Sequence, residues 1–325
     1  MGATLLRGSS IGKHGEGLKT YYSDSFILPL PPDHRFPIDK YSRLRRSILE
    51  KEVIPTQDLR IPEPASFEHI GHVHQSDYID RVVNGALSQK EIRRIGFPWS
   101  PELVERSRRS VGGTIAACRT AFQDGVAVNL AGGTHHAHAD FGSGYCVLND
   151  CAIAARTMQC EGRTSQVLIL DCDVHQGDGT AAIFSSDPSV FTFSIHGARN
   201  FPFRKEHSDL DLALEDDTSD ETYLNALENG LKQTFSNFEA DLVIYLAGAD
   251  PYFEDRLGRL ALTKSGLGKR DQLVYNYTRE AGLPLAIVLA GGYARDINHT
   301  VDIHINTIRL ASKYAESYRL LTSAN

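Results

Sequence analysis

The chain has 325 residues, of which 41% are hydrophobic and 23% are charged, a composition typical of a globular protein that is long enough to bury a large core. Its net charge of −7 argues against direct nucleic-acid binding and against a membrane-surface protein. No run of about 18 apolar residues could span a bilayer, and Met1 to Ser10 lack the apolar centre of a secretory signal. The five cysteines are an odd number without a Cys-x-x-Cys pair, so we expect neither a disulfide framework nor a cysteine-ligated zinc. These features indicate a cytoplasmic protein and say nothing about its oligomeric state.

Along the chain, helix start signals alternate with apolar runs that predict buried strands. Residues 1–18 are rich in Gly and Ser and predict a flexible segment. The helix signals are Ser100 before Pro101, Asn149 before Asp150 in an Ala-rich stretch, and a Thr218-x-x-Glu221 capping box. The strands are expected at 125–130, 167–170, 190–195, 242–246 and 284–289. Because strands alternate with helices, we predict an α/β fold of three α/β/α layers around a central, mainly parallel sheet.

Polar residues that carry chemistry follow four of these runs directly. In an open parallel sheet, binding sites lie beyond the carboxyl ends of the strands, so residues that follow different strands can meet there. The expected strand ends lead, in chain order, into His135 and His136, into the segment Asp171 to Asp178, into Asp250 and into Tyr293. Acidic groups at the end of a buried strand need a cation or a proton partner.

The best candidates for metal ligands are Asp173, His175 and Asp250. Two carboxylates and one imidazole would leave a coordination position open for water, as in catalytic rather than structural zinc sites. A cation held in this way lowers the pKa of its water and polarises a carbonyl oxygen, and the hydrolysis of an amide needs both effects.

The neighbouring residues predict the remaining catalytic groups. The tandem His135 and His136 could serve as general base and general acid, because imidazoles titrate near neutral pH. Tyr293 could donate a hydrogen bond to the oxyanion. Asp171 and Asp178 are interpreted as acceptors that orient the two histidines and not as ligands.

Other histidines are interpreted as structural. The His72-x-His74 pair has the spacing of metal ligands but lies away from the strand ends, so we predict a structural or surface role. His138 is expected to flank the pocket, and His196 to be a structural histidine at a strand end.

Several separated motifs in this order resemble the histone deacetylase family, which has the arginase/deacetylase fold. The resemblance runs from about Lys19 to about Ala311 and predicts that residues 19–325 form a single deacetylase-like catalytic domain. It rests on the segments Gly132 to His136, Ser143 to Asp150, Asp171 to Thr180, Ala247 to Asp250 and Gly291 to Tyr293. The segments Pro32 to Pro37 and Asp255 to Leu260, together with Gln176, resemble the class IV branch and its bacterial relatives.

The resemblance implies a zinc-dependent hydrolase that removes acetyl or longer fatty acyl groups from the side-chain amine of lysine. It implies Zn²⁺ on Asp173, His175 and Asp250, with Fe²⁺ as a second possibility. His136 would be the base that activates water, and His135 would help to protonate the leaving amine. Gly144 and Tyr145 would line the channel for the acyl-lysine stem. A structural K⁺ is implied near Asp171, Asp173, His175 and Ser194.

One feature of the family's pattern is missing. No residue matches the acidic rim residue with which many deacetylases hold the substrate backbone, and the segment from Phe97 to Ser100 falls near that place. This leaves open whether the substrate is a protein or a small acylated amine such as a polyamine.

Two further hypotheses belong to other classes. A binuclear manganese ureohydrolase of the same fold would need an aspartate two residues before Asp250, where Gly248 stands. A pseudoenzyme that only binds acyl-lysine should lack an essential group, whereas both histidines, all three candidate ligands and Tyr293 are present.

Overall fold

The centre of the molecule is an eight-stranded sheet in which all the neighbouring strands of the described chain are parallel. The structure is a computed structural model that describes residues 17–323, with side chains as far as residue 316. In spatial order the strands are β2 (Leu59–Arg60), β1 (Thr20–Tyr21), β3 (Val126–Asn129), β8 (Leu285–Val288), β7 (Leu242–Leu246), β4 (Val167–Asp171), β5 (Val190–Gly197) and β6 (Leu210–Leu214).

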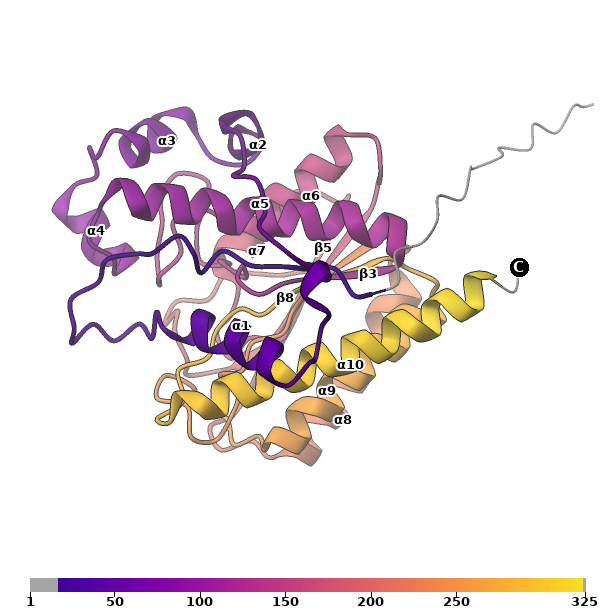
Figure 1. The fold of residues 1–325 in the computed structure, drawn as a ribbon. Coiled ribbons are helices and arrows are strands. Elements are labelled where there is room, and N and C mark those ends of the chain that lie inside the picture. Colours follow the sequence, from indigo (N-terminus) through magenta and orange to yellow (C-terminus); the bar gives the residue numbers. More distant parts are fainter. Residues whose placement is uncertain (1–16, 324–325) are drawn as a thin grey trace, which may run out of the picture.

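Helices cover both faces of this sheet (Figure 1). One face packs against α1 (Lys40–Glu50), α8 (Asp220–Asn237), α9 (Lys264–Glu280) and α10 (Ile297–Ser323). The core on the other face contains residues of α2 (Phe67–Gly71), α3 (Ser76–Val83), α4 (Gln89–Ile95), α5 (Pro101–Asp124), α6 (Asp150–Cys160) and α7 (Asp178–Phe184). A short 3₁₀ helix, η1 (Thr56–Asp58), precedes β2. The predicted three-layer α/β/α fold is confirmed.

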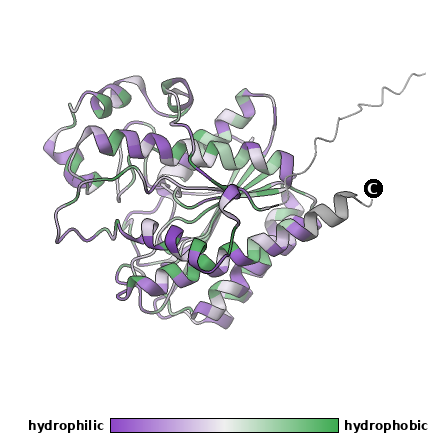
Figure 2. Ribbon diagram, in the orientation of Figure 1, coloured by the Kyte–Doolittle hydropathy of each residue, from purple (hydrophilic) through white to green (hydrophobic). Residues whose placement is uncertain are grey.

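Two hydrophobic cores follow from the alternation of side chains along the strands. In β4, Leu168 and Leu170 belong to the core beneath α1, α8, α9 and α10, while Val167 and Ile169 belong to the core beneath α5 and α6. Because both faces are covered, the central strands are apolar throughout. The helices need only one apolar stripe and carry hydrophobic residues beside hydrophilic ones (Figure 2).

The five expected strands are all present, and two of the three helix start signals are confirmed. The Ser100 hydroxyl accepts from the backbone N–H of Leu103, and the Asn149 side chain accepts from that of Ala152. The Thr218-x-x-Glu221 prediction is wrong, because α8 begins one residue later with Ser219 as its N-cap. The Thr218 hydroxyl instead donates to the carbonyl of Glu215.

The described N-terminal end packs into the protein, and the cysteines form no disulfide. Of the segment 1–18 expected to be flexible, residues 1–16 lie outside the described residues, and Leu18 is buried in the core. The five cysteines are free, and Cys160 alone among them is exposed. Between residues 17 and 323, no helix combines the length and the apolar character that a membrane span requires.

A buried ion pair connects α9 to the carboxyl ends of β7 and β4. Arg270, fully buried, pairs with Asp271 at 2.8 Å and donates to the carbonyls of Gly248 and Cys172, which follow these strands. Asp271 also accepts from Tyr245 of β7 and from Thr307 of α10, at 2.6 Å each. The network thereby fixes the loops that extend β7 and β4.

Arg270→Met is expected to lower the free energy of unfolding by about 3–5 kcal/mol, because it leaves the buried Asp271 charge without its partner. Denaturant unfolding measures the effect. The matched control is Lys269→Met on the exposed side of the same helix, where a change within about 0.5 kcal/mol is expected. Equal stability of the two variants would contradict the importance of the network.

Candidate active site

Four neighbouring strands bring the candidate residues to one edge of the sheet. β3, β8, β7 and β4 lie side by side in this order, and their carboxyl ends share one edge because the strands are parallel. The residues that follow them are the ones singled out in the sequence: His135 and His136 after β3, Tyr293 after β8, Asp250 after β7, and Asp173, His175 and Asp178 after β4, whose last residue is Asp171.

Asp173, His175 and Asp250 form the group in the described chain that could hold a metal ion, with one ligand atom of each within 4.8 Å of the others. His175 Nδ1 lies 3.0 Å from Asp173 Oδ1 and 3.3 Å from Asp250 Oδ2. Backbone amides orient the carboxylates across neighbouring strand ends. Gly291 N donates to Asp173 Oδ2 at 2.8 Å, and Val174 N donates to Asp250 Oδ1 at 3.0 Å.

The charges of this cluster fit a divalent cation. Asp250 Oδ2 is buried and accepts no hydrogen bond, which is costly unless a cation meets it. Burial and the neighbouring Asp173 raise the pKa of Asp250 to about 7. Burial alone would lower the pKa of His175, but Asp173 and Asp250 raise it to about 10. Two carboxylates and one imidazole are the donors of a catalytic zinc site, with one coordination position open.

Gly291→Ala is expected to lower metal affinity by about 10- to 100-fold, the effect typical of disturbing groups that orient metal ligands. A Cβ at position 291 would lie 1.9 Å from Asp250 Oδ2 and 2.6 Å from Asp173 Oδ2, so both carboxylates would have to move. Titration of the metal-free protein with Zn²⁺ measures the affinity. Gly71→Ala is the control, since nothing lies within 4 Å of its Cβ position. Wild-type affinity in Gly291→Ala would contradict the assignment of these ligands.

The tandem histidines each have their own carboxylate. Nδ1 of His135 donates to Asp171 Oδ2, and Nδ1 of His136 donates to Asp178 Oδ1, both at 2.6 Å. The two rings are 4.2 Å apart at their centroids. Nε2 of His135 lies 3.9 Å from Asp173 Oδ1, which places the pair beside the metal-binding cluster. Both Nε2 atoms are therefore left for a substrate or water.

The surroundings of the two imidazoles give them opposite pKa shifts. Burial and the adjacent His135 lower the pKa of His136 to about 4. Burial also acts to lower the pKa of His135, but the Asp171 carboxylate overcomes it and raises the pKa to about 9. At neutral pH one ring is thus neutral and can accept a proton, while the other carries a proton that it can donate.

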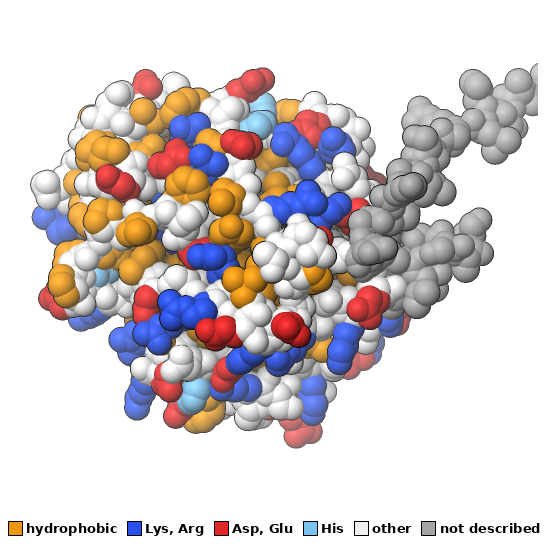
Figure 3. Space-filling model, in the orientation of Figure 1, with side chains coloured by type: hydrophobic (Ala, Val, Ile, Leu, Met, Phe, Trp, Pro, Cys, Tyr) orange, Lys and Arg blue, Asp and Glu red, His pale blue; other side chains and the backbone are white. Residues whose placement is uncertain are grey.

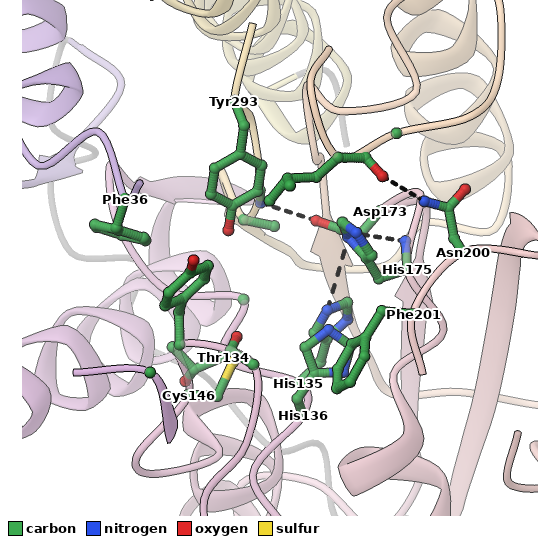
Figure 4. A pocket seen from close by; sticks show the side chains of 18 of the residues that line it. Phe36, Thr134, His135, His136, Cys146, Asp173, His175, Asn200, Phe201 and Tyr293 are labelled. Atoms are coloured by element: carbon green, nitrogen blue, oxygen red, sulfur yellow. Dashed lines mark hydrogen bonds and ion pairs between the residues drawn. The ribbon is translucent and has the colours of Figure 1, made fainter. Parts of the chain in front are cut away.

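Tyr293 enters the pocket from the side opposite the two histidines (Figure 4). Its backbone N–H donates to Asp255 Oδ2 at 2.6 Å, and the other oxygen of Asp255 accepts from Leu257 N and Gly258 N. Nζ of the buried Lys40 lies 5.3 Å from the centroid of the Tyr293 ring. Burial, with Asp250 and Asp173 nearby, raises the pKa of Tyr293 well above its usual value, so the phenol keeps the proton it would donate.

A pocket of about 610 Å³ opens onto these groups, and Gly144 and Tyr145 both line it. Gly144 has a positive φ of 52°. A Cβ there would lie 2.7 Å from the His136 ring and 2.9 Å from Phe201, so glycine keeps the passage open between them. Phe201 packs edge to face against His136 at 4.9 Å, and Phe36 lies 5.2 Å from Tyr145 on the other wall.

Sequence reasoning missed three residues that shape this pocket, namely Phe36, Lys40 and Phe201. Phe201 could have been found, because it lies in the loop after β5 and the rule of strand ends applies to that loop as well. Phe36 and Lys40 precede or begin α1, and no strand end points to them.

The histidines interpreted as structural lie outside the metal-binding cluster. His74 is buried, and its Nε2 accepts from Asn149 N at the start of α6. Burial lowers the pKa of His74 to about 4. His138 Nε2 lies 3.3 Å from Asp178 Oδ2, beside the pocket, and Nδ1 of the buried His196 is 2.9 Å from the Ser194 hydroxyl.

Comparison with solved structures identifies the fold. The chain superposes on a histone deacetylase homologue from Aquifex aeolicus with a TM-score of 0.81 and 23% identity, covering 92% of this chain and 84% of the other. The parallel sheet with its helices on both faces makes this an α/β protein of the arginase/deacetylase fold.

Sequence comparison identifies the family. The histone deacetylase domain matches residues 34–308. An uncharacterised protein of Picosynechococcus is 45% identical over 89% of this chain and 96% of its own length. Histone deacetylase 2 of Arabidopsis thaliana is 29% identical over 84% of this chain and 74% of its own length. The chain belongs to the histone deacetylase family, a family of hydrolases.

Proposed function

We propose that this protein is a zinc-dependent amidohydrolase that removes acyl groups from the side-chain amine of lysine. The observation that carries the proposal is that two residues of the metal-binding cluster, the tandem histidines and Tyr293 line one pocket. The carboxylates of Asp250, Asp171 and Asp178 contact His175, His135 and His136 respectively. A divalent cation bound to that cluster would activate water and polarise the acyl carbonyl.

The chain's own groups would handle the protons. His136 is neutral at pH 7, because its pKa is lowered to about 4, and its Nδ1–H is held by Asp178. Its Nε2 can therefore take the proton of the attacking water. His135, protonated at pH 7, can pass a proton to the leaving amine, and Tyr293 can donate its phenolic hydrogen bond to the carbonyl oxygen as negative charge develops there.

The binuclear alternative is opposed by the packing at Gly248. An aspartate at this position would begin from a Cβ that lies 2.6 Å from Asp173 Oδ2 and 2.9 Å from Asp250 Oδ1. A second pair of bridging carboxylates does not fit there, which supports one divalent metal per chain. The register that pairs Asp171 with Ser194 supports the proposed K⁺ near these residues.

A lysine peptide bearing acetyl, octanoyl or myristoyl tests the function, assayed with protein loaded with Zn²⁺, Fe²⁺ or Mn²⁺. We expect hydrolysis that a chelator abolishes, and one metal ion per chain by mass spectrometry. The acyl group that is removed fastest would distinguish a deacetylase from a fatty deacylase. Two manganese ions per chain without hydrolysis would overturn the proposal. If the protein hydrolysed acetylated polyamines but no lysine peptide, the proposed substrate would be a small acylated amine and not acyl-lysine.

Membership of the class IV branch and a cytoplasmic location stay predictions. The class IV resemblance and a cytoplasmic location rest on the sequence features already described. Gln176, one of these features, hydrogen-bonds to the backbone of Glu206 and to Asp211, so it connects two loops near the pocket.

The pH profile of kcat/KM is expected to have limbs near pH 4 and pH 9. A base acts in its neutral form, so activity should rise as His136 loses its proton near pH 4. An acid acts in its protonated form, so activity should fall as His135 loses its proton near pH 9. Measurement between pH 4 and 10 tests this, and Asp171→Asn should move the alkaline limb to lower pH. An alkaline limb that stays in place in this variant would contradict the role of His135.

A further inference from the structure

The pocket is strongly cationic although the chain as a whole is acidic. Its lining contains one carboxylate, Asp173, which belongs to the metal-binding cluster. Besides Lys40, five arginines line the pocket, and we call them the arginine mouth: Arg93, Arg94, Arg199, Arg256 and Arg259. The chain carries a net charge of −7, and over the face seen in Figure 3 cationic and acidic side chains are interspersed. The charge of the pocket lining is therefore opposite to that of the whole chain.

The arginine mouth lies at the entrance of the pocket and is built from three separate segments. Arg93 and Arg94 belong to the last turn of α4. Arg199 follows β5, and Arg256 and Arg259 lie between β7 and α9. All five side chains are exposed, whereas Asp173, His175 and Asp250 are buried. When the acyl group of a substrate reaches the buried metal-binding cluster, the rest of the acylated amine lies near the pocket entrance. The five arginines would therefore surround that outer part of the substrate.

Acidic groups of the described chain neutralise this mouth only in part. Arg199 and Arg259 share Asp216, at 3.8 and 3.2 Å, and Arg199 also lies 3.8 Å from Glu215. Within residues 17–316, neither Arg93 nor Arg256 forms an ion pair. Arg256 Nε donates to the Tyr293 carbonyl.

Arg94 is held by other contacts. Its Nε donates to the Gly142 carbonyl, and its guanidinium stacks 3.8 Å above the Phe141 ring. Because these contacts leave the positive charge in place, the mouth has more cations than anions.

We propose that the enzyme selects acylated amines that carry carboxylates next to the acylated position, such as acyl-lysine in an acidic peptide or at a free C-terminus. This rests on the proposed deacylase function. A cationic entrance raises the local concentration of anionic substrates and repels cationic ones. The pocket lining contains no carboxylate besides Asp173 that would repel such substrates. A nucleic-acid backbone is the competing occupant, and the net charge of −7 disfavours it.

The test compares acetyl-lysine peptides flanked by two Glu, two Gln or two Lys, and peptides ending in acetyl-lysine with a free or an amidated carboxyl group. We expect kcat/KM to fall in the order Glu, Gln, Lys by about three-fold a step at low salt, the size of exposed charge pairs. The differences should shrink to within about two-fold in 1 M salt, where the screening length is about 3 Å. The free carboxyl should be preferred over the amide.

Variants of single arginines distinguish an effect of the arginine mouth from an effect of the protein's overall charge. Arg93→Gln and Arg199→Gln should each lower kcat/KM for the Glu peptide about three-fold and leave the Gln peptide unchanged. Arg119→Gln, on α5 and outside the pocket lining, should change neither. Equal rates for all three peptides, an unchanged preference in both mouth variants, or inhibition by oligonucleotide without any carboxylate preference would overturn the inference. Hydrolysis of none of the peptides would overturn the proposed function and this inference with it.

Discussion

Replacing His136 with alanine is expected to lower kcat by about 10²- to 10⁴-fold, the usual contribution of a general base, while the protein keeps its metal. The side chain is not among the three candidate ligands, so its loss should remove proton transfer and leave metal binding intact. The fixed Nδ1–H···Asp178 bond directs the basic Nε2 into the pocket. Kinetics on a fluorogenic acyl-lysine, together with metal analysis, measures the effect.

His138→Ala is the matched control for this prediction. His138 contacts the other oxygen of Asp178 at 3.3 Å but lies outside the pocket lining. Its removal leaves the bond between His136 and Asp178 in place, so activity should stay within about ten-fold of the wild type. Full activity of His136→Ala with its metal bound would assign the base to another group.

Tyr293→Phe is expected to lower kcat by about 10²- to 10³-fold, the loss measured when one oxyanion donor is removed. The change deletes a single hydroxyl and keeps the ring that packs near Phe36 and Tyr145. Because the donor acts on charge that develops in the transition state, KM should change little. Steady-state kinetics with metal analysis separates this loss from a loss of metal.

The supporting contacts make this prediction specific. Asp255 holds the Tyr293 backbone through a 2.6 Å hydrogen bond, and this bond is unaffected when the hydroxyl is removed. Tyr41→Phe is the control, since Tyr41 also lines the pocket but follows no strand end; its kcat should remain within about three-fold of the wild type. A Tyr293→Phe enzyme as active as this control would remove Tyr293 from the mechanism.

The sheet and the cluster at its edge could be predicted because they rest on local patterns. An apolar run such as 167–170 predicts a strand, and parallel strands place their carboxyl ends at one edge. The strand pattern and the rule of strand ends together predicted that Asp173 and Asp250 meet. The hydrogen bond from Val174 N to Asp250 Oδ1, between residues 76 positions apart, joins the same two strand ends. The spatial order of the strands was not needed for this inference.

What could not be predicted depends on packing between distant segments. β1 and β2 have two residues each, which is too short for a periodic pattern. Lys40 is buried against the rings of Phe36 and Tyr41, which are near it in the sequence. Its other two partners, the carbonyl of Ala290 and the ring of Tyr293, are about 250 residues away and could not be foreseen. The cap of α8 was misplaced by one residue because Thr218 and Ser219 are both suitable N-caps.

The order of the strands also determines when the site can form as the chain is synthesised. β7 and β8 are the last strands to be made, yet they lie between β3 and β4. Until residue 288 has left the ribosome, the two ends that carry His136 and Asp173 have no common neighbour to hold them together. β3 and β4 can therefore gain their neighbours β8 and β7 only late in synthesis, β3 after more than a hundred further residues have been made, and their facing edges stay unpaired until then.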